Sequence, residues 1–413
     1  MPSSRELDLL SRRERVLSST YRLFYDEPVH VVRAEGVWMF DADGRRYLDA
    51  YNNVPVVGHG HPYVVDRLSR QARLLNTHTR YLTDAPLELA ERLIATLPQE
   101  LRHVTFTCTG SEANDLAVRI AKAATAGTGF IVTKYAYHGT TEATAALSPA
   151  SGIALGPNVF GFEVAPSNPA AFGSRVRECI ESMQRAAVRP AALIIDTILS
   201  SDGVISHPAG FLAEAVEAIH DAGGLFIADE VQPGFGRTGE GMWGFQRHGV
   251  IPDIVTMGKP MGNGHPIAAI VTRAEVAKEF ASRTQYFNTY GGNTVSCEVG
   301  LAVLEVIERE DLIAHVREVG SYIEQKLREL AESHSALTDV RGIGLFIGVQ
   351  TESPATAKRL ANQMRRLGVL IGTTGPRSDT LKIRPPLIFA RADADLLLQA
   401  LSTALREASQ RSI

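Results

Sequence analysis

The stretch LFIADEVQPGFGRTG, residues 225–239, decides how the large part of the chain folds. It begins as an apolar, β-rich run that ends in two adjacent carboxylates, Asp229 and Glu230. Its second half, GFGRTG (234–239), fits the dinucleotide pattern G-x-G-x-x-G, which should follow a strand directly and open a helix. Here several residues separate the strand from the glycines, and the loop-like EGMWGFQRHG follows. The glycine pattern therefore predicts a turn beside a site, not a nicotinamide-binding loop.

The region around this stretch alternates between strand and helix patterns. Amphipathic runs such as 111–125 and 209–223 separate short β-rich runs at 103–108, 129–134, 192–197, 225–229, 253–257 and 267–272. This alternation is typical of a mostly parallel sheet covered on both faces. We therefore expect a large α/β domain over residues 55–295.

The pattern changes after residue 296. A long charged segment (297–334) has helical periodicity, GIGLFIGVQ (342–350) and LKIRPPLIF (381–389) read as strands, and two further helical runs follow them. These features predict a smaller α+β domain over 296–413. An Asp-Gly turn at 43–44 predicts a hairpin in the N-terminal segment 1–54, which we expect to join that smaller domain.

Composition excludes several classes of protein. The 413 residues are 45% hydrophobic and carry a formal net charge of -4, which argues against nucleic-acid and membrane-surface partners. Three cysteines lie far apart without a C-x-x-C pair, which fits a reducing cytoplasm and no structural zinc. We see no secretory signal and no run of 18 apolar residues. His59 and His61 have no third ligand in view, so we expect a turn there and no metal site.

Two strand ends carry the candidate chemistry. Asp229 ends one strand, and Lys259 follows the strand DIVTM thirty residues later. Ligands of open α/β sheets bind at the carboxyl ends of strands. A lysine and an aspartate so placed suit pyridoxal phosphate: the lysine carries the cofactor covalently, and the aspartate keeps the ring nitrogen protonated. The alternative on spacing alone is a pair of ordinary strand-end residues.

Three further segments add to this hypothesis, and each has an ordinary alternative. Gly110 and Ser111 lie between a strand and a helix, where free N–H groups attract phosphate; capping alone would also explain Ser111. Tyr137 in KYAYHGTT offers a flat face for a ring, or simply packs. Thr289 in NTYGGN stands beside two glycines, in what is otherwise a plain turn.

Together, the motifs CTGSEAND, YAYHG, FIADEVQPGFGRTG, DIVTMGKPMGNG and NTYGGN resemble those of the class III (ω-amino acid) aminotransferases. The resemblance extends from DGRRYLD to LKIRPPLIF. It implies fold type I, with a mostly parallel seven-stranded sheet, and a homodimer with shared active sites. It implies that Lys259 carries pyridoxal 5'-phosphate and moves the proton, and that Thr289 binds the phosphate of the partner subunit. The remaining cofactor-binding residues that it implies are Gly110, Ser111, Tyr137, His138, Asp229, Val231 and Gln232. Among them, the resemblance implies that Gln232 reaches the ring hydroxyl and that Val231 and Tyr137 cover the two ring faces.

Within the family, NTHTRYL, GKPMGNGHP, RGIGLFIGV and GPRSDTLKIRPP resemble the ethanolamine-phosphate phospho-lyase branch. Members that use glutamate typically carry an acid that pairs with a C-terminal arginine. Here Ser201 occupies the place of that acid and Lys382 stands near the place of that arginine, with Arg384 two residues on. We take Arg80, Lys382 and Arg384 as candidate substrate residues.

The leading interpretation is transamination from a primary amine or ω-amino acid to a keto acid such as pyruvate. The alternative is elimination of phosphate and ammonia from an amino-alcohol phosphate such as phosphoethanolamine. A third, from another class, is a non-catalytic binding protein; the presence of both Lys259 and Asp229 argues against it.

Overall fold

Seven strands form the sheet that carries residues 225–239, in the order β4-β10-β9-β8-β7-β5-β6. Only β10 runs antiparallel to its neighbours, so the mostly parallel seven-stranded sheet is confirmed in this computed structural model, which describes residues 4–410. The patterns missed β6, a short edge strand. The strands are β4 (Leu101–Thr107), β5 (Gly129–Thr133), β6 (Val159–Phe162), β7 (Pro190–Asp196), β8 (Leu225–Asp229), β9 (Ile254–Met257) and β10 (Ala268–Arg273).

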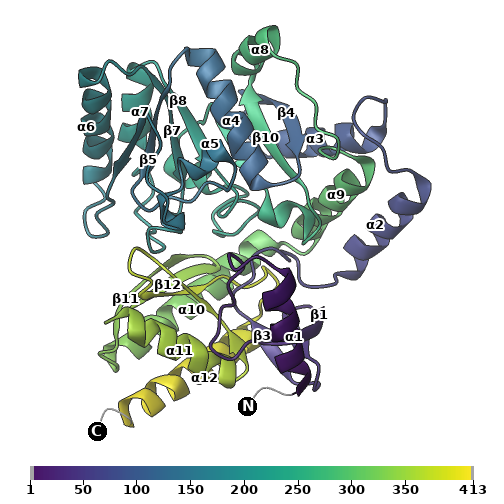
Figure 1. Ribbon diagram of the computed structural model, residues 1–413, viewed down its shortest axis with the longest axis vertical. Helices are drawn as coiled ribbons and strands as arrows, with labels where there is room; N and C mark the ends of the chain where they lie inside the picture. Colours follow the sequence, from purple (N-terminus) through teal and green to yellow (C-terminus); the bar gives the residue numbers. More distant parts are fainter. Residues whose placement is uncertain (1–3, 411–413) are drawn as a thin grey trace.

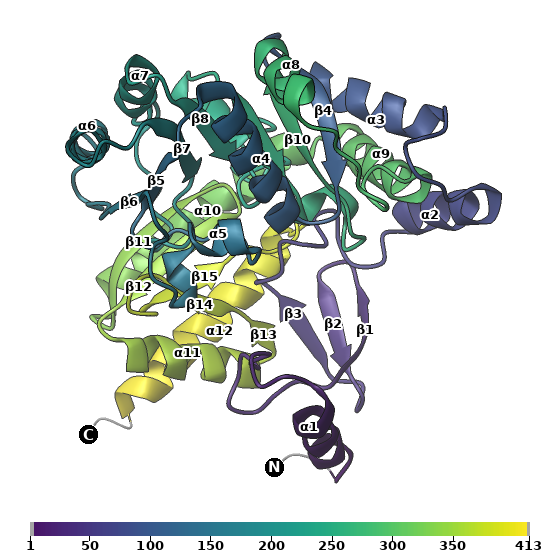
Figure 2. The same cartoon turned by 45° about the horizontal axis from the view of Figure 1, so that its top comes forward.

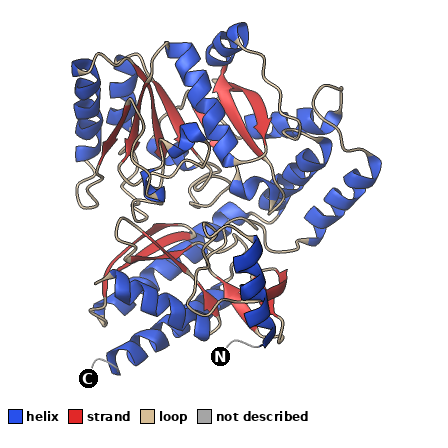
Figure 3. Ribbon diagram, in the orientation of Figure 1, coloured by secondary structure: helices blue, strands red, loops and turns tan. Residues whose placement is uncertain are grey.

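Helices cover both faces of this sheet (Figures 1 and 3). Alternate residues of β7 show why both faces must be covered: Leu193 and Ile195 enter one buried cluster, whereas Ala192 and Ile194 enter another. The helices of this lobe are α2 (Pro62–Leu74), α3 (Asp84–Ala95), α4 (Gly110–Thr125), α5 (Glu142–Ala145), α6 (Ala171–Arg185), α7 (Ala213–Asp221), α8 (Ala274–Arg283) and α9 (Thr294–Arg309), with short 3-10 turns at Pro149–Ser151, Gly244–His248 and Lys259–Gly262.

Two four-stranded sheets build the second lobe, below the first in Figure 1. One has the order β1-β2-β3-β13 and joins the N-terminal segment to the C-terminal part, because β3 pairs in parallel with β13. The other has the order β11-β12-β15-β14. The elements are β1 (Val31–Glu35), β2 (Trp38–Asp41), β3 (Arg46–Asp49), β11 (Leu337–Ile343), β12 (Phe346–Thr351), β13 (Val369–Leu370), β14 (Gly372–Thr374), β15 (Thr380–Ile383), α1 (Ser4–Val16), α10 (Leu312–Glu332), α11 (Pro354–Arg366) and α12 (Arg391–Gln410).

Local expectations for this lobe are met in part. β2 and β3 form the predicted hairpin, with Gly44 at φ 82° in its turn. The long helical run is two helices, because Asp311 adopts φ 46° between α9 and α10. GIGLFIGVQ is not one strand but the turn and flanks of the hairpin β11–β12. The domain limits 1–54, 55–295 and 296–413 stay predictions, and residues 1–3 and 411–413 lie outside the described range.

Three glycines, Gly239, Gly320 and Gly344, form a glycine seam where the two lobes meet: a contact made by backbone atoms without intervening side chains. A Cβ on Gly344 would lie 2.5 Å from the Thr238 carbonyl carbon, and one on Gly239 would lie 2.7 Å from the Arg317 amide. A Cβ on Gly320 of α10 would collide with the Gly344 backbone. The turn after β8, helix α10 and the β11–β12 hairpin therefore meet backbone to backbone.

Two observations concern membrane spans and metal sites. Within residues 4–410, no helix is long and apolar enough to cross a membrane. The same part of the chain contains no group of three His, Cys, Asp or Glu side chains that could hold a metal ion. His59 is instead bound to the buried carboxylate of Asp49, with 2.7 Å between Nε2 and Oδ2.

An aromatic cluster buries two histidines beside the sheet. The ring of Phe211 lies 5.0 Å from that of His207 and 4.7 Å from that of His248. His248 Nδ1 accepts a hydrogen bond from the Gly210 amide, and its Nε2 is buried without a partner. Burial lowers the pKa of His207 to about 4 and that of His248 to about 3.

These two histidines predict a loss of stability in acid. Below pH ~6.5 the unfolded chain binds protons that the native cluster excludes, so the contribution of these two histidines to the free energy of unfolding falls as the pH drops towards about 4. Buried carboxyl groups with a raised pKa, such as Glu230, contribute with the opposite sign, so the comparison between variants carries the prediction. Urea unfolding between pH 7.5 and 4.5 measures this slope. Relative to wild type, His207→Phe should lose less stability on acidification, whereas His103→Gln, at an exposed position, should follow wild type. An unchanged slope in His207→Phe would contradict the assignment.

Candidate functional site

The two adjacent carboxylates of the opening stretch face different surroundings. Asp229 and Thr256 are paired across β8 and β9, and the Glu230 amide donates to the Thr256 carbonyl over 2.8 Å. Glu230 Oε2 accepts from the Gly244 amide over 2.7 Å, and its Oε1 accepts from the Phe245 amide over 2.9 Å. Burial raises the pKa of Glu230 to about 8. Glu230 therefore anchors the following loop, and Asp229 is left as the carboxylate of the site.

Donors from three segments hold the buried Asp229 side chain. Its Oδ2 accepts from Asn114 Nδ2 over 2.8 Å and lies 2.7 Å from His138 Nδ1, and its Oδ1 accepts from the Val231 amide over 3.1 Å. Asn114 also accepts from the Thr256 hydroxyl, which leaves its amide one orientation. Sequence reasoning missed Asn114, although a polar residue on the sheet-facing side of CTGSEAND was a signal for it.

Lys259 begins the 3-10 turn after β9, the strand next to Asp229. Burial and the nearby Arg384 charge lower the pKa of Lys259 to about 8, against the opposing effects of Asp229 and Asp196. Asn263 ends the turn at φ 47° and bonds the Val57 amide and the Gly58 carbonyl. The structure thus brings the predicted lysine and aspartate into one electrostatic environment.

The first turn of α4 offers free backbone donors. Thr109 is the N-cap and closes a capping box with Glu112, so the capping explanation for Ser111 is wrong. Gly110 and Ser111 are the first two helical residues, whose amides have no intrahelical acceptor. Ser111 Oγ accepts from the Thr140 amide over 3.1 Å and lies 3.4 Å from the Thr140 hydroxyl, so its proton can go either to that hydroxyl or to an anion. This helix end can therefore hold an anion.

Close packing ties this helix end to the other site segments. A Cβ on Gly110 would lie 2.9 Å from both methyl groups of Val231. A Cβ on Gly258, just before Lys259, would lie 3.2 Å from Gly110 Cα. Neither glycine has room for a side chain, so the first turn of α4, the end of β8 and Lys259 share one backbone framework.

Gln232 connects this framework to the second lobe. Its Oε1 accepts from Asn53 Nδ2 over 2.9 Å and from Arg384 Nη1 over 2.6 Å. The Arg384 guanidinium lies 4.6 Å from the ring centre of Tyr51, and the backbone amide of Arg384 donates to the Ala50 carbonyl. Sequence reasoning did not predict Asn53, whose stretch YNN resembles an ordinary turn.

Two buried cations lie on the second lobe. Lys382 and Arg384 are each 7% exposed, and among residues 4–410 no carboxylate lies within ion-pairing distance of either. Burial and the Arg384 charge lower the pKa of Lys382 well below its usual value. Asp196 is the acid that interacts with Lys382, but it is occupied by donors from Ile198 and Ser200.

The segment that carries Ser201 packs against the sheet β11-β12-β15-β14, which contains Lys382. It is bounded by two buried residues in the left-handed region, Leu199 (φ 49°) and Val204 (φ 58°). A Cβ on Gly348 would lie 2.9 Å from Val204 Cβ, and Gly348 pairs with Lys382. Such strained positions persist where the surroundings determine them, commonly at functional sites.

Three predicted residues lie outside this network. Tyr137 is 39% exposed, and Thr289 is exposed in the loop between α8 and α9. Arg80 stacks on Phe287 of that same loop, 3.8 Å from its ring centre. Within the described chain, no hydrogen bond or ion pair joins these three residues to Asp229 or Lys259.

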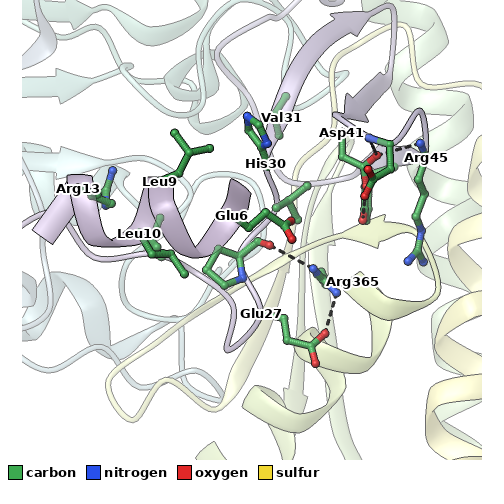
Figure 4. A pocket seen from close by; sticks show the side chains of 15 residues that line it. Glu6, Leu9, Leu10, Arg13, Glu27, His30, Val31, Asp41, Arg45 and Arg365 are labelled. Carbon is green, nitrogen blue, oxygen red and sulfur yellow. Dashed lines mark hydrogen bonds and ion pairs between the residues drawn. The ribbon is translucent and has the colours of Figure 1, made fainter. Parts of the chain in front are cut away.

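A cavity of about 620 Å³ lies elsewhere, between α1 and the N-terminal strands (Figure 4). Its polar groups are bonded to one another: Arg365 bonds Glu27 over 2.9 Å, and Asp41 accepts from Tyr47 over 3.0 Å. None of the predicted site residues lines it. The candidate site is therefore the cluster around Asp229 and Lys259.

Comparison with known proteins agrees with this geometry. The family model "Aminotransferase class-III" matches residues 24–405. The chain is 35% identical to an alanine–glyoxylate aminotransferase 2-like protein of Drosophila melanogaster (95% of this chain, 85% of the relative) and 35% identical to an ethanolamine-phosphate phospho-lyase homolog of Caenorhabditis elegans (79% and 76%). A phospholyase from Arthrobacter, solved in complex with phosphoethanolamine, is 41% identical with a TM-score of 0.93 over 97% of this chain and 99% of that one. The chain belongs to the class III aminotransferase family.

Proposed function

We propose that Lys259 carries pyridoxal 5'-phosphate, the cofactor of the class III aminotransferases, with Asp229 on the ring nitrogen. The residues present fit that group. Asp229 is a buried carboxylate with two donors on one oxygen and one on the other, and the first turn of α4 offers free amides for the phosphate. Val231 and Tyr137 lie on the two segments that would pack against opposite faces of the cofactor ring.

The bound cofactor supplies an electron sink for a carbanion next to the amino group. Lys259 Nζ removes the proton from that carbon, since its lowered pKa makes the neutral amine available near pH 8. Asp229 keeps the ring nitrogen protonated, and the Asn114 amide holds that carboxylate in place. These steps serve transamination and elimination equally.

The reaction that the site supports best is elimination from an amino-alcohol phosphate such as phosphoethanolamine. The observation that carries this proposal is the pair of buried cations, Lys382 and Arg384, which lack a carboxylate partner. A phosphate dianion bound between them would restore the proton on Lys382, whose pKa is lowered by burial and by Arg384, and would accept bidentate bonds from arginine. As the C–H electrons form a C=C bond, phosphate leaves with the C–O electrons; water then releases ammonia and the aldehyde.

The relatives support this proposal without deciding it. The solved phospholyase with phosphoethanolamine bound is more similar to this chain than a Bacillus anthracis aminotransferase at 27% identity and TM-score 0.87. We therefore place elimination ahead of transamination. Transamination remains the second candidate, because a relative 35% identical over 95% of the chain bears an aminotransferase name.

The proposed reaction predicts phosphate release without a keto acid. Enzyme loaded with pyridoxal phosphate and given phosphoethanolamine alone should release phosphate over many turnovers, because elimination regenerates the cofactor without an acceptor. Lys382→Met should lower kcat/KM at least about thirtyfold, or ~2 kcal/mol. Exposed Lys278→Met is the matched control. No release, together with keto-acid-dependent conversion of an amine, would reverse the proposal.

The Lys259 amine predicts a pH dependence of cofactor loading. Only the neutral amine reacts with the cofactor aldehyde, so the loading rate of the apoenzyme should rise with pH and level off above about 8. Absorbance after rapid mixing measures this rate. Arg384→Gln removes a neighbouring cation, so its plateau should move to higher pH. A wild-type rate that still rises steadily to pH 10 would contradict the lowered pKa.

We further propose a homodimer whose subunits share sites. Large apolar side chains are exposed near the loop of Thr289: Leu82 is 99% exposed, Leu74 80% and Tyr290 72%. A surface of this kind is typical of a protein–protein interface. A second copy that covers it would bring Thr289 to the partner's cofactor phosphate.

Mixed subunits test the shared site. Lys259→Ala and Thr289→Ala chains are each expected to be impaired, but a hybrid dimer would place both lesions in one site and leave the other intact. Mixing should therefore restore activity towards a quarter of the wild-type level, because about half of the dimers are hybrids with one intact site. Failure to recover activity, with subunit exchange verified by differently tagged chains, would mean that the Thr289 contact lies within one chain.

A further inference from the structure

We propose that Asn53 and Arg384 are positioning residues that fix the Gln232 side-chain amide in one orientation, with its NH₂ group presented to the ring hydroxyl of the cofactor. This inference rests on the proposed placement of that cofactor on Lys259. It assigns a function to Asn53, which lies 179 residues before Gln232 and touches neither Asp229 nor Lys259 by a hydrogen bond.

The orientation follows from the chemistry of the neighbours. A guanidinium has donors and no acceptor, so the Gln232 atom 2.6 Å from Arg384 Nη1 must be the amide oxygen. The same oxygen lies 2.9 Å from the Asn53 amide, which must then present its nitrogen. Both lone pairs of the oxygen are used, and Nε2 is turned to the opposite side, where no acceptor within residues 4–410 bonds it.

Both positioning residues are themselves fixed. Asn53 is 2% exposed, and the turn before it is held by Asp49, whose Oδ1 accepts from the Tyr51 and Asn52 amides over 3.1 and 2.8 Å. Arg384 is bonded through its backbone to Ala50 and lies on the Tyr51 ring. One short segment, residues 49–53, therefore places both donors of the pair.

The test is the pH titration of the visible absorption band of the cofactor-loaded enzyme, without substrate. A donor on the ring hydroxyl would draw negative charge away from that oxygen; without the donor, the neighbouring Lys259 Nζ would hold its proton more tightly. Asn53→Asp is isosteric but faces the Gln232 oxygen with another acceptor. This variant should displace the Gln232 side-chain amide and raise the midpoint of the absorption titration by on the order of one pH unit.

Asn52→Asp is the matched control. It adds the same charge one residue away, and its carboxylate still accepts from the Val54 amide. Equal midpoints in Asn53→Asp and wild type, or equal shifts in the two Asp variants, would overturn the proposal. If Asn53→Asp fails to hold the cofactor, Asn53→Ala replaces it. That variant should shift the midpoint less but in the same direction, and no shift would overturn the proposal.

The outcome separates this inference from the proposed function. The band reports the bound cofactor and not the reaction, so loss of the phospho-lyase proposal leaves the titration valid. A band that fails to form with the wild-type chain would remove both the cofactor role of Lys259 and the role of Asn53. A band that forms but ignores Asn53→Asp removes only the latter.

Discussion

The site depends on keeping one buried carboxylate, that of Asp229, in a fixed place. A carboxylate at the end of a buried strand is costly unless donors surround it. Asn114 from α4, His138 from the loop after β5 and the Val231 amide supply those donors. Three segments that are distant in sequence are thereby required to meet at one edge of the sheet. The same three segments carry the first turn of α4, the loop of Tyr137 and the start of the stretch that reaches the second lobe.

That stretch connects the two lobes through successive polar contacts. Glu230 anchors the loop at Gly244 and Phe245, Gln232 meets Arg384, and Arg237 donates to the carbonyls of Leu345 and Pro385. Arg237 is 1% exposed, and its contact with Pro385 lies next to Arg384 in the chain. The cations of the second lobe are thus positioned from the strand end that carries Asp229.

Hydrophobic pattern was enough to predict the sheet, because buried parallel strands are continuous apolar runs bounded by turns. β6 was missed because VFGF is short and partly exposed, and the break at Asp311 was missed because it depends on one backbone conformation. The motifs indicated Lys259, Asp229 and Gln232. They did not indicate the partners of Asn114 or Asn53: a polar residue on the sheet-facing side of CTGSEAND was a signal for Asn114, but the groups that an amide contacts depend on the folded structure. The thirty-residue spacing between Asp229 and Lys259 became informative only once β8 and β9 were neighbours.

The glycine seam between the lobes has a thermal consequence. Side chains at an interface gain rotamer freedom when it loosens, and this gain grows with temperature. Gly239, Gly320 and Gly344 have no rotamers, so their contact offers no such gain. Local loosening of this seam on warming can be driven only by the backbone and by neighbouring side chains. Because glycine gains more backbone freedom than any other residue when a contact is released, warming should loosen the lobes at this point through the backbone, with little change in side-chain order.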